Sequence, residues 1–471
     1  MVMLVVIPRE ELPTPRGSLL VEGLAYNEKG QREMINFRRV FVSLMTAVLA
    51  FAMTIGLASN GVAATSSVEL RLFCWGFAED IWGSYVLDMI KTFESKNPTI
   101  KVLPEKTTFG EKESVFTTRS EARQAPDVAR FTYDPIALFA SKGYLLNLTP
   151  LANQERKEFL GQWHPTAIEV LTKDKKLYAL PEDFMPFVLI YNTEMFKKAN
   201  LDPNKPPKTW DEFLTYAKAL TRDTNKDGQI DQWGFGMIGS RNPGLFPRFS
   251  PWIWSAGGDY LTPDNSTSAL MRPETLEGVR FFIDLYRKHG VVPPGAPEAG
   301  PQEVRTQMAY EKVGMMIGTG FDPGIVGQLN PKFDAKNILR MAAVPAPAGR
   351  KSKTAASLGM WVISSQTKNP KEAWALVKFF TGFESQMESY RKNGWVSARK
   401  DVADSSEIKS DKFARILTQE ASNAMFPPVI VKWPQIGDIV ITAIHNSLTG
   451  ISTVEEAFSR ADRDVNRILG K

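Results

Sequence analysis

Residues 68–102 decide the fold and read VELRLFCWGFAEDIWGSYVLDMIKTFESKNPTIKV. Apolar and polar residues alternate over 68–74, which is typical of a β-strand. Apolar residues then recur at helical spacing over 82–93, and Asn97-Pro98 ends that helix. A second strand begins over 100–102. This strand–helix–strand unit predicts two parallel strands joined by a right-handed crossover.

Strand and helix patterns keep alternating along the chain, which predicts an α/β fold. Short apolar or alternating runs predict further strands at 127–131, 187–191, 313–317 and 361–364. Helices are predicted over 113–123 and 134–142, at starts marked by Thr209, Pro273 and Pro370, and after a cap at Ser452 to Glu455. The length of 471 residues exceeds what one core accommodates, so we expect two domains.

The composition excludes several classes of protein. With 43% hydrophobic and 23% charged residues, the chain is neither disordered nor a coiled coil nor a disulfide scaffold. A net charge of +5 gives no reason to expect a nucleic-acid partner. The single cysteine, Cys74, excludes internal disulfides and multi-cysteine metal sites. The sequence has no G-x-S-x-G, Walker or H-E-x-x-H motif of the common enzyme classes.

Residues 1–64 are predicted to be a targeting segment. Arg38 and Arg39 precede an apolar run over 40–57, and small residues end at Ala63 and Ala64, as in a secretory signal peptide. We expect cleavage after Ala64, or after Ala63, and a single membrane span is the alternative. Translation from Met34 would explain the additional residues 1–33.

Several phrases of the mature chain occur together in a recognisable order. They are Trp75-Gly76, Phe93–Val102, Ala125–Val128, Gly143–Leu148, Tyr191–Phe196, Thr209–Phe213, Gly257-Gly258, Gly314–Met316, Asn369–Trp374 and Ser452–Ala457. In this order, across residues 68–470, the chain resembles the extracellular solute-binding proteins of bacterial ABC transporters, in the family that binds sugars and oligosaccharides.

The resemblance implies an α/β fold of two lobes joined by a three-segment hinge, with ligand bound in the cleft between the lobes. It places the N-lobe at 66–184 and 344–366 and the C-lobe at 185–343 and 367–471. The hinge crossings would then fall near Met185, Val344 and Gln366. The implied function is to capture a sugar or oligosaccharide in the periplasm and deliver it to a membrane permease. We expect a monomer that needs no cofactor and performs no catalysis.

A sugar site needs aromatic platforms and a few polar groups, and α/β sheets bind ligands at the carboxyl ends of their strands. The candidate ligand-binding residues that lie at or after strand ends are Trp75, Gly76, Glu79, Phe131, Tyr133, Asp134, Gly320 and Phe321. Four more candidates are Asp183 at the proposed first crossing, Trp252 and Trp254 in the densest aromatic stretch, and Trp361. Each aromatic residue has an alternative role in a core. Asp134 is equally suited to cap a helix that begins at Pro135.

A short loop resembles a calcium-binding loop of the EF-hand type. Its candidate ligands are Asp223, Asn225, Asp227, Gln229 and Asp231, and Gly228 would make the sharp turn. Position twelve of the pattern is Gly234, so the usual bidentate Glu is missing. We expect either a structural calcium site or a loop that binds nothing.

The alternative function is a secreted glycoside hydrolase, which uses two carboxylates on either side of the scissile bond. Asp134 and Glu182 are the pair that could face each other.

Overall fold

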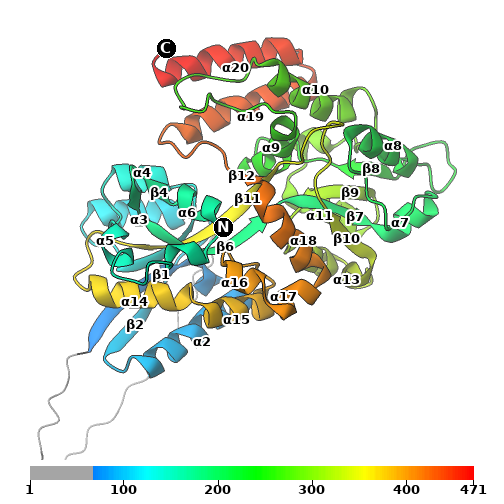
Figure 1. Ribbon diagram of the computed structural model, residues 1–471. Helices are drawn as coiled ribbons and strands as arrows, with labels where there is room; N and C mark the ends of the chain where they lie inside the picture. The colour runs from blue at the N-terminus through cyan, green and yellow to red at the C-terminus, as the bar shows by residue number, and fades with distance from the viewer. Residues whose placement is uncertain (1–66) are drawn as a thin grey trace, which may run out of the picture. The chain divides into compact units, whose positions relative to one another are not determined.

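The computed structural model describes residues 67–471, without the side chains of Asp80 and Ile81. The predicted signal peptide and its cleavage site lie outside this range. Within it, buried apolar residues form two hydrophobic cores, each built around a main β-sheet (Figure 1). We call the core that contains Leu70 and its elements the first lobe, and the core that contains Leu189 and its elements the second lobe.

The first lobe is built on a six-stranded sheet with the order β12-β11-β3-β1-β2, in which β6 also pairs with β11. Its strands are β1 (Val68–Cys74), β2 (Ile100–Lys106), β3 (Val128–Thr132), β6 (Ala179–Pro186), β11 (Thr354–Ile363) and β12 (Ala424–Met425). β1 is parallel to both β2 and β3, whereas β11 is antiparallel to β3 and β6. The parallel pairing of β1 with β2 confirms the prediction from residues 68–102.

Helices and one hairpin surround this sheet. They are η1 (Trp75–Ala78), α2 (Asp80–Lys96), α3 (Lys112–Glu121), α4 (Ile136–Ser141), α5 (Thr149–Ala152), η2 (Leu160–Gln162), α6 (Pro165–Val170), β4 (Thr172–Lys173), β5 (Lys176–Leu177), α14 (Pro370–Phe380) and α15 (Phe383–Asn393). Trp82, Val86 and Phe93 are buried on one face of α2, as their helical spacing predicts.

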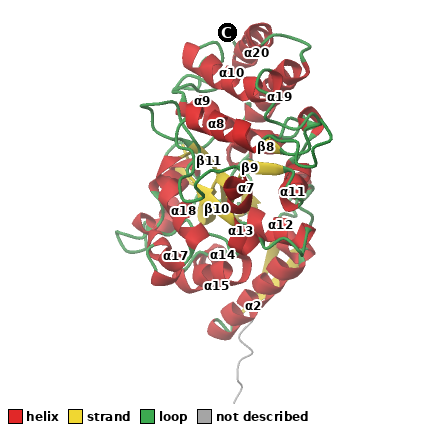
Figure 2. Ribbon diagram, turned by 90° about the vertical axis from the view of Figure 1, so that its right-hand side faces the viewer, coloured by secondary structure: helices red, strands yellow, loops and turns green. Residues whose placement is uncertain are grey.

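The second lobe is built on a four-stranded sheet with the order β10-β7-β9-β8. Its strands are β7 (Val188–Asn192), β8 (Trp233–Gly236), β9 (Val313–Gly318) and β10 (Leu339–Ala342). Figure 2 shows helices around these strands. They are α7 (Thr193–Lys198), α8 (Trp210–Leu220), η3 (Pro243–Leu245), α9 (Phe246–Ser255), α10 (Pro273–Arg287), η4 (Ala296–Glu298), α11 (Pro301–Ala309), α12 (Asp322–Leu329), α13 (Ala335–Ile338), α16 (Lys400–Ala403), α17 (Ser406–Ser410), α18 (Lys412–Glu420), η5 (Ala421–Asn423), α19 (Trp433–Thr449) and α20 (Val454–Leu469).

Capping boxes fix the starts of two helices. The Thr209 hydroxyl accepts the Glu212 N–H at the start of α8, and the Glu212 carboxylate accepts the Thr209 N–H, both at 3.2 Å. The same arrangement starts α20 with Thr453 and Glu456, one residue later than the cap predicted at Ser452. Each box satisfies two backbone donors that a helix start leaves without a partner.

Within the described residues, three neighbouring segments pass between the two cores, and the chain passes again on either side of β12, which pairs with β11 and lies between α18 and α19 in the sequence. Phe184 belongs to the first core and Phe187 to the second, and β11 crosses between Ala355 and Ala356. The third crossing is 396–398, which pairs with the outer edge of β6 through a bridge between Asp183 and Ser397. The crossing segments are therefore hydrogen-bonded neighbours in the order β11, β6 and 396–398.

Two predicted crossings are not found where the resemblance placed them. Val344 belongs to the second core, and the Gln366 side chain donates to the Ser120 carbonyl of the first lobe at 2.6 Å. The reason is that the apolar stripe of α14 packs on the first sheet, where Phe380 stacks on Trp361 at 4.5 Å. No helix between residues 67 and 471 is both long and apolar enough to cross a membrane.

Candidate functional site

The ends of β1 and β3 bring two predicted site segments to one edge of the first sheet. The strands are parallel with Phe73 opposite Ala129, so Trp75 and Tyr133 both follow that edge. Tyr133 is half-buried. Desolvation is the main reason that the pKa of its phenol is raised, and the charges of Asp134 and Tyr260 raise it further. The Tyr133 ring packs edge-on against Phe426 at 4.7 Å.

Asp134 is solvent-accessible at the same edge and has no capping role. Helix α4 begins at Ile136 with Pro135 as its N-cap residue, and no side-chain capping bond is made. Surrounding protein atoms desolvate the carboxylate enough to raise the pKa of Asp134, although the Thr132 hydroxyl donates to it and lowers the pKa. A carboxylate that helix capping does not use remains available to accept hydrogen bonds from a ligand.

Arg130, a residue that was not in the predicted set, organises the interior beside this edge. Its side chain on β3 is 2% exposed and forms ion pairs with Glu182 and, at 2.5 Å, with Asp183. Its guanidinium carbon lies 4.3 Å from the ring centroids of both Trp75 and Trp82. A charged residue inside the apolar run of β3 was the signal in the sequence, because a buried arginine needs carboxylate partners.

This cluster corrects the roles predicted for three residues. Asp183 is 3% exposed and occupied by Arg130, so it is not free to accept hydrogen bonds from a sugar. Trp75 is buried as a partner of the guanidinium. Gly76 is buried against Trp82, since a Cβ at this position would lie 2.6 Å from that indole.

Glu79 remains exposed near the same cluster. Desolvation raises the pKa of its carboxyl, and the charge of Arg130 acts in the opposite direction. Of the predicted first-lobe residues, Glu79, Tyr133 and Asp134 therefore keep side-chain surface that a ligand can reach.

The end of β9 forms the corresponding edge of the second lobe. Phe321 is half-buried, with the Arg305 guanidinium carbon 5.6 Å from its ring centroid. Asp322 is buried and accepts the Arg305 Nε–H at 2.6 Å and the Thr319 N–H at 2.5 Å, which fixes the turn. Gly320 lines a cavity of about 370 Å³ together with residues of α15, α17 and α18.

Comparison with known proteins identifies the family. A family model described as bacterial extracellular solute-binding protein matches residues 79–387. The chain belongs to this family. Its relatives include a putative binding protein of Brucella abortus strain 2308, which is 25% identical over 392 residues covering 83% of this chain and 90% of the relative.

Two further relatives have named ligands. The sn-glycerol-3-phosphate-binding periplasmic protein UgpB of Escherichia coli O1:K1 is 23% identical over 450 residues, covering 89% of this chain and 96% of UgpB. A solved ABC transporter solute-binding protein of Thermotoga lettingae, bound with α-D-tagatose, is 29% identical with a TM-score of 0.74, covering 86% of this chain and all of that structure. These similarities confirm the predicted two-lobed α/β fold.

Two tryptophans of this solute-binding protein were wrongly predicted to stack on the ligand. Trp252 is 0% exposed inside the second core, and its indole N–H donates to the Arg248 carbonyl at 3.0 Å. Trp254 is also buried, and its indole N–H donates to the Asp259 carboxylate at 3.1 Å. Both lie on α9, which packs against α10 and β11, and both are part of the second core.

Phe131 and Trp361 likewise belong to the first core and have no surface for a ligand. Phe131 packs edge-on against Phe116 at 5.0 Å, and Trp361 stacks on Phe380. Phe131 lies inside β3, which ends one residue later than predicted, and Trp361 lies inside β11, which begins at Thr354 and not at residue 361, so both side chains lie within the sheet.

The loop over 223–231 uses its carboxylates internally. Asp223 accepts the backbone N–H groups of Lys226 and Gly228 at 2.7 and 2.8 Å, and Asp231 accepts both donors of Thr224. Across residues 67–471, no group of three or more His, Cys, Asp or Glu side chains is placed to hold a metal ion. The two alternatives for this loop, a structural calcium site and a loop that binds nothing, both stay predictions.

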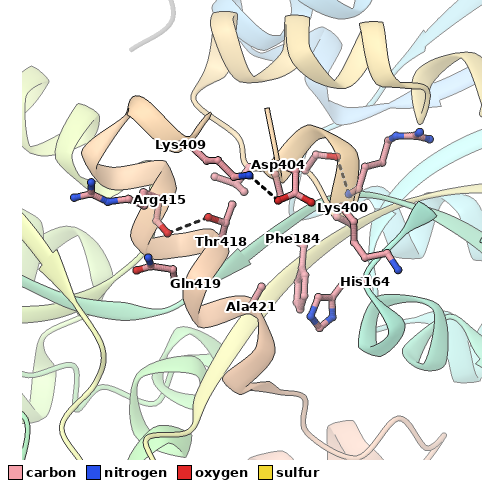
Figure 3. A pocket seen from close by; sticks show the side chains of 14 residues that line it. His164, Phe184, Lys400, Asp404, Lys409, Arg415, Thr418, Gln419 and Ala421 are labelled. Carbon is pink, nitrogen blue, oxygen red and sulfur yellow. Dashed lines mark hydrogen bonds and ion pairs between the residues drawn. The ribbon is translucent and has the colours of Figure 1, made fainter. Parts of the chain in front are cut away.

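A cavity of about 500 Å³ lies elsewhere between the lobes (Figure 3). None of the predicted ligand-binding residues lines it. Its walls include His164 and Phe184 from the first lobe and Thr418 of α18 from the second.

Proposed function

We propose that this solute-binding protein captures a sugar between the edges formed by the ends of β1, β3 and β9 and delivers it unaltered to the permease of an ABC transporter. The observation that carries the proposal is the similarity, over 86% of the chain, to a solute-binding protein that holds α-D-tagatose. The hydrogen-bonded crossing segments support it, because a hinge of this kind lets two lobes close on a ligand.

The chemistry of the exposed groups suits a hydroxyl-rich ligand. The Asp134 carboxylate and the Tyr133 phenol offer an acceptor and a donor at one edge. Phe109, which is 55% exposed and packs edge-on against Trp75 at 5.4 Å, and the half-buried Phe321 offer apolar surface for the faces of a sugar ring. Phe109 was not in the predicted set, because no strand pattern ends directly at it.

We propose that no catalysis accompanies binding. A glycoside hydrolase needs two carboxylates that reach the scissile bond. Glu182, one member of the suggested pair, is 1% exposed and bound to Arg130, so it cannot serve as acid or nucleophile beside Asp134 in this arrangement. The family of extracellular solute-binding proteins and the periplasmic relative UgpB support a periplasmic location. We also propose that the protein acts as a monomer.

The proposal is tested by calorimetric titration and thermal shift with D-tagatose, other hexoses, maltose and sn-glycerol 3-phosphate. We expect one neutral sugar to bind with 1:1 stoichiometry and to be recovered unchanged. If sn-glycerol 3-phosphate binds and every sugar fails, the sugar class is wrong. Appearance of hydrolysis products would favour the hydrolase instead.

A matched pair of variants tests the proposed residue. Asp134→Asn removes the charge with little change of shape, and a hydrogen bond to a charged group is worth about 1.5–3 kcal/mol, so we expect Kd to rise about 10- to 150-fold. Asp88→Asn changes an exposed carboxylate on α2 and should leave Kd unchanged. Equal affinities of both variants would remove Asp134 from the site.

A further inference from the structure

The cavity between His164, Phe184 and α18 joins parts of both lobes. Figure 3 shows His164 and Phe184 on one side, with Thr418 of α18 across from them. Ala414 and Leu417 anchor α18 in the second core, whereas Phe184 belongs to the first. Any rotation of one lobe against the other therefore changes the distance between these walls.

The cavity lies on the far side of the hinge strands from Asp134. The segment 396–398, which lines it, pairs with the outer edge of β6, where the Phe184 N–H donates to the Val396 carbonyl at 2.8 Å. β3, which leads to Asp134, pairs with the opposite edge of β11. The β11–β6 pair thus lies between the 396–398 wall of the cavity and β3, and Phe426 links the two regions because it stacks on Phe184 at 5.9 Å and packs edge-on against Tyr133 at 4.7 Å.

The groups that line the cavity combine apolar surface, hydroxyl-binding groups and two cations, Lys400 and Arg415, that have no salt bridge among the described residues. The rings of Phe184 and His164 lie 5.2 Å apart and form an aromatic wall. Asp404 and Lys409 form an ion pair at 3.0 Å beside it (Figure 3). Lys400 lies close enough to His164 to lower the pKa of that imidazole after desolvation, and it has no salt bridge among the described residues.

Each class of small ligand uses a different part of this lining. A neutral sugar could stack on Phe184 and bond to Asp404 and Lys409, but it would leave the charge of Lys400 unpaired. A simple carboxylate such as acetate would pair with Lys400 and leave the aromatic wall and Asp404 unused. A sugar acid, which carries ring hydroxyls and one carboxylate, uses the aromatic wall, the pair of Asp404 and Lys409, and the charge of Lys400.

We propose that this cavity is a second binding site, for a sugar acid, and that its occupation opposes sugar binding at the strand ends. The second part rests on the proposed function. Closure of the lobes on one side of the hinge strands spreads them on the other, so an occupant that contacts both Phe184 and α18 is bound less well when the lobes close. By linkage, it raises the Kd of the sugar by the same factor.

The site itself is tested without reference to the sugar. We expect D-glucuronate or D-gluconate to bind by calorimetry, more tightly than D-glucose or acetate, with the preference lost in Lys400→Ala. Lys392→Ala removes an exposed lysine of α15 that likewise has no salt bridge in the described chain, and it should bind like wild type. Failure of both sugar acids, or equal affinity of Lys400→Ala and wild type, would overturn the site.

The coupling is tested by repeating the D-tagatose titration, or that of whichever sugar binds, at saturating D-glucuronate. Couplings between sites are typically about 5- to 150-fold, so we expect the Kd of the sugar to rise at least about fivefold in wild type and to stay constant in Lys400→Ala. An unchanged Kd in wild type would overturn the coupling. If no sugar binds at all while D-glucuronate binding still depends on Lys400, the proposed function fails and the cavity site stands.

Discussion

Gly359 offers a sharp test of the buried ion pairs. It lies on β11 opposite Thr132, and its N–H donates to the Asp183 carboxylate. Desolvation raises the pKa of Asp183, and this hydrogen bond acts in the opposite direction. A Cβ at this position would lie 2.9 Å from Asp183 Cγ and 2.5 Å from Arg130 Nη2, and closer still to Asp183 Oδ2. Real Cβ atoms do not approach other atoms so closely, so Gly359→Ala must displace the carboxylate and break its ion pair.

The size of the effect follows from the burial of the pair. Breaking a buried ion pair by displacing one partner costs about 3–5 kcal/mol, because a charge is left without compensation. In a domain of the size of one lobe, each kcal/mol lost from the free energy of unfolding lowers Tm by about 2–4 °C, so we expect Tm to fall by about 6–20 °C. The Glu182 ion pair with Arg130 remains, which places the expected loss at the lower end of this range.

Thermal and urea unfolding followed by tryptophan fluorescence provide the assay, since Trp75, Trp82 and Trp395 surround the Arg130 guanidinium. The control is Gly324→Ala in α12, where a Cβ meets no atom within 4 Å. Alanine is favoured over glycine inside a helix by roughly 0.5–1 kcal/mol, so this control should be slightly stabilised. A Gly359→Ala protein as stable as wild type would refute the steric argument.

Three further predictions follow from burial and hydrogen bonding. Desolvation raises the pKa of Glu182 above its ordinary value of 4.5, so its contribution to stability is present below pH 4.5 and is lost as the pH rises through the folded pKa. As the pH rises, the urea midpoint of Glu182→Gln should therefore fall less steeply than that of wild type. An identical pH dependence of the two proteins would contradict the raised pKa of Glu182. Trp252→Ala should lose about 3–5 kcal/mol of stability and keep the sugar Kd of wild type, whereas a weakened Kd in the folded variant would restore the stacking role. Millimolar calcium should leave Tm unchanged, because the carboxylates of the loop 223–231 accept its own backbone donors; a rise in Tm would establish a calcium site.

The sequence predicted those parts of the fold that depend on local pattern. Alternation over 68–74 and helical spacing over 82–93 gave β1 and α2, and the capping box at Thr209 gave the start of α8. These features depend on neighbours within a few residues, so the pattern alone specifies them. The order of phrases along the chain gave the family, which the family model confirms.

The site was predicted less well because it depends on contacts far apart in the chain. Arg130 meets Glu182 and Asp183 some 52 and 53 positions later, and no local pattern marks that encounter. A dense aromatic stretch has the same sequence signal whether its rings face a ligand or a core, which is why Trp252 on α9 was assigned wrongly. The third crossing was predicted at the wrong place for a similar reason. The apolar stripe of α14 packs on the first sheet, but its sequence pattern is equally compatible with packing on either lobe.

The bonding of the crossing segments to one another has a mechanical consequence. Separate linkers could each swivel, but strands joined edge to edge must deform as one ribbon, which twists readily and resists shear. The lobes are therefore expected to rock about a single axis, and a stiffening substitution in any one of the crossing segments should slow the whole movement. A membrane partner would then meet a narrow range of orientations.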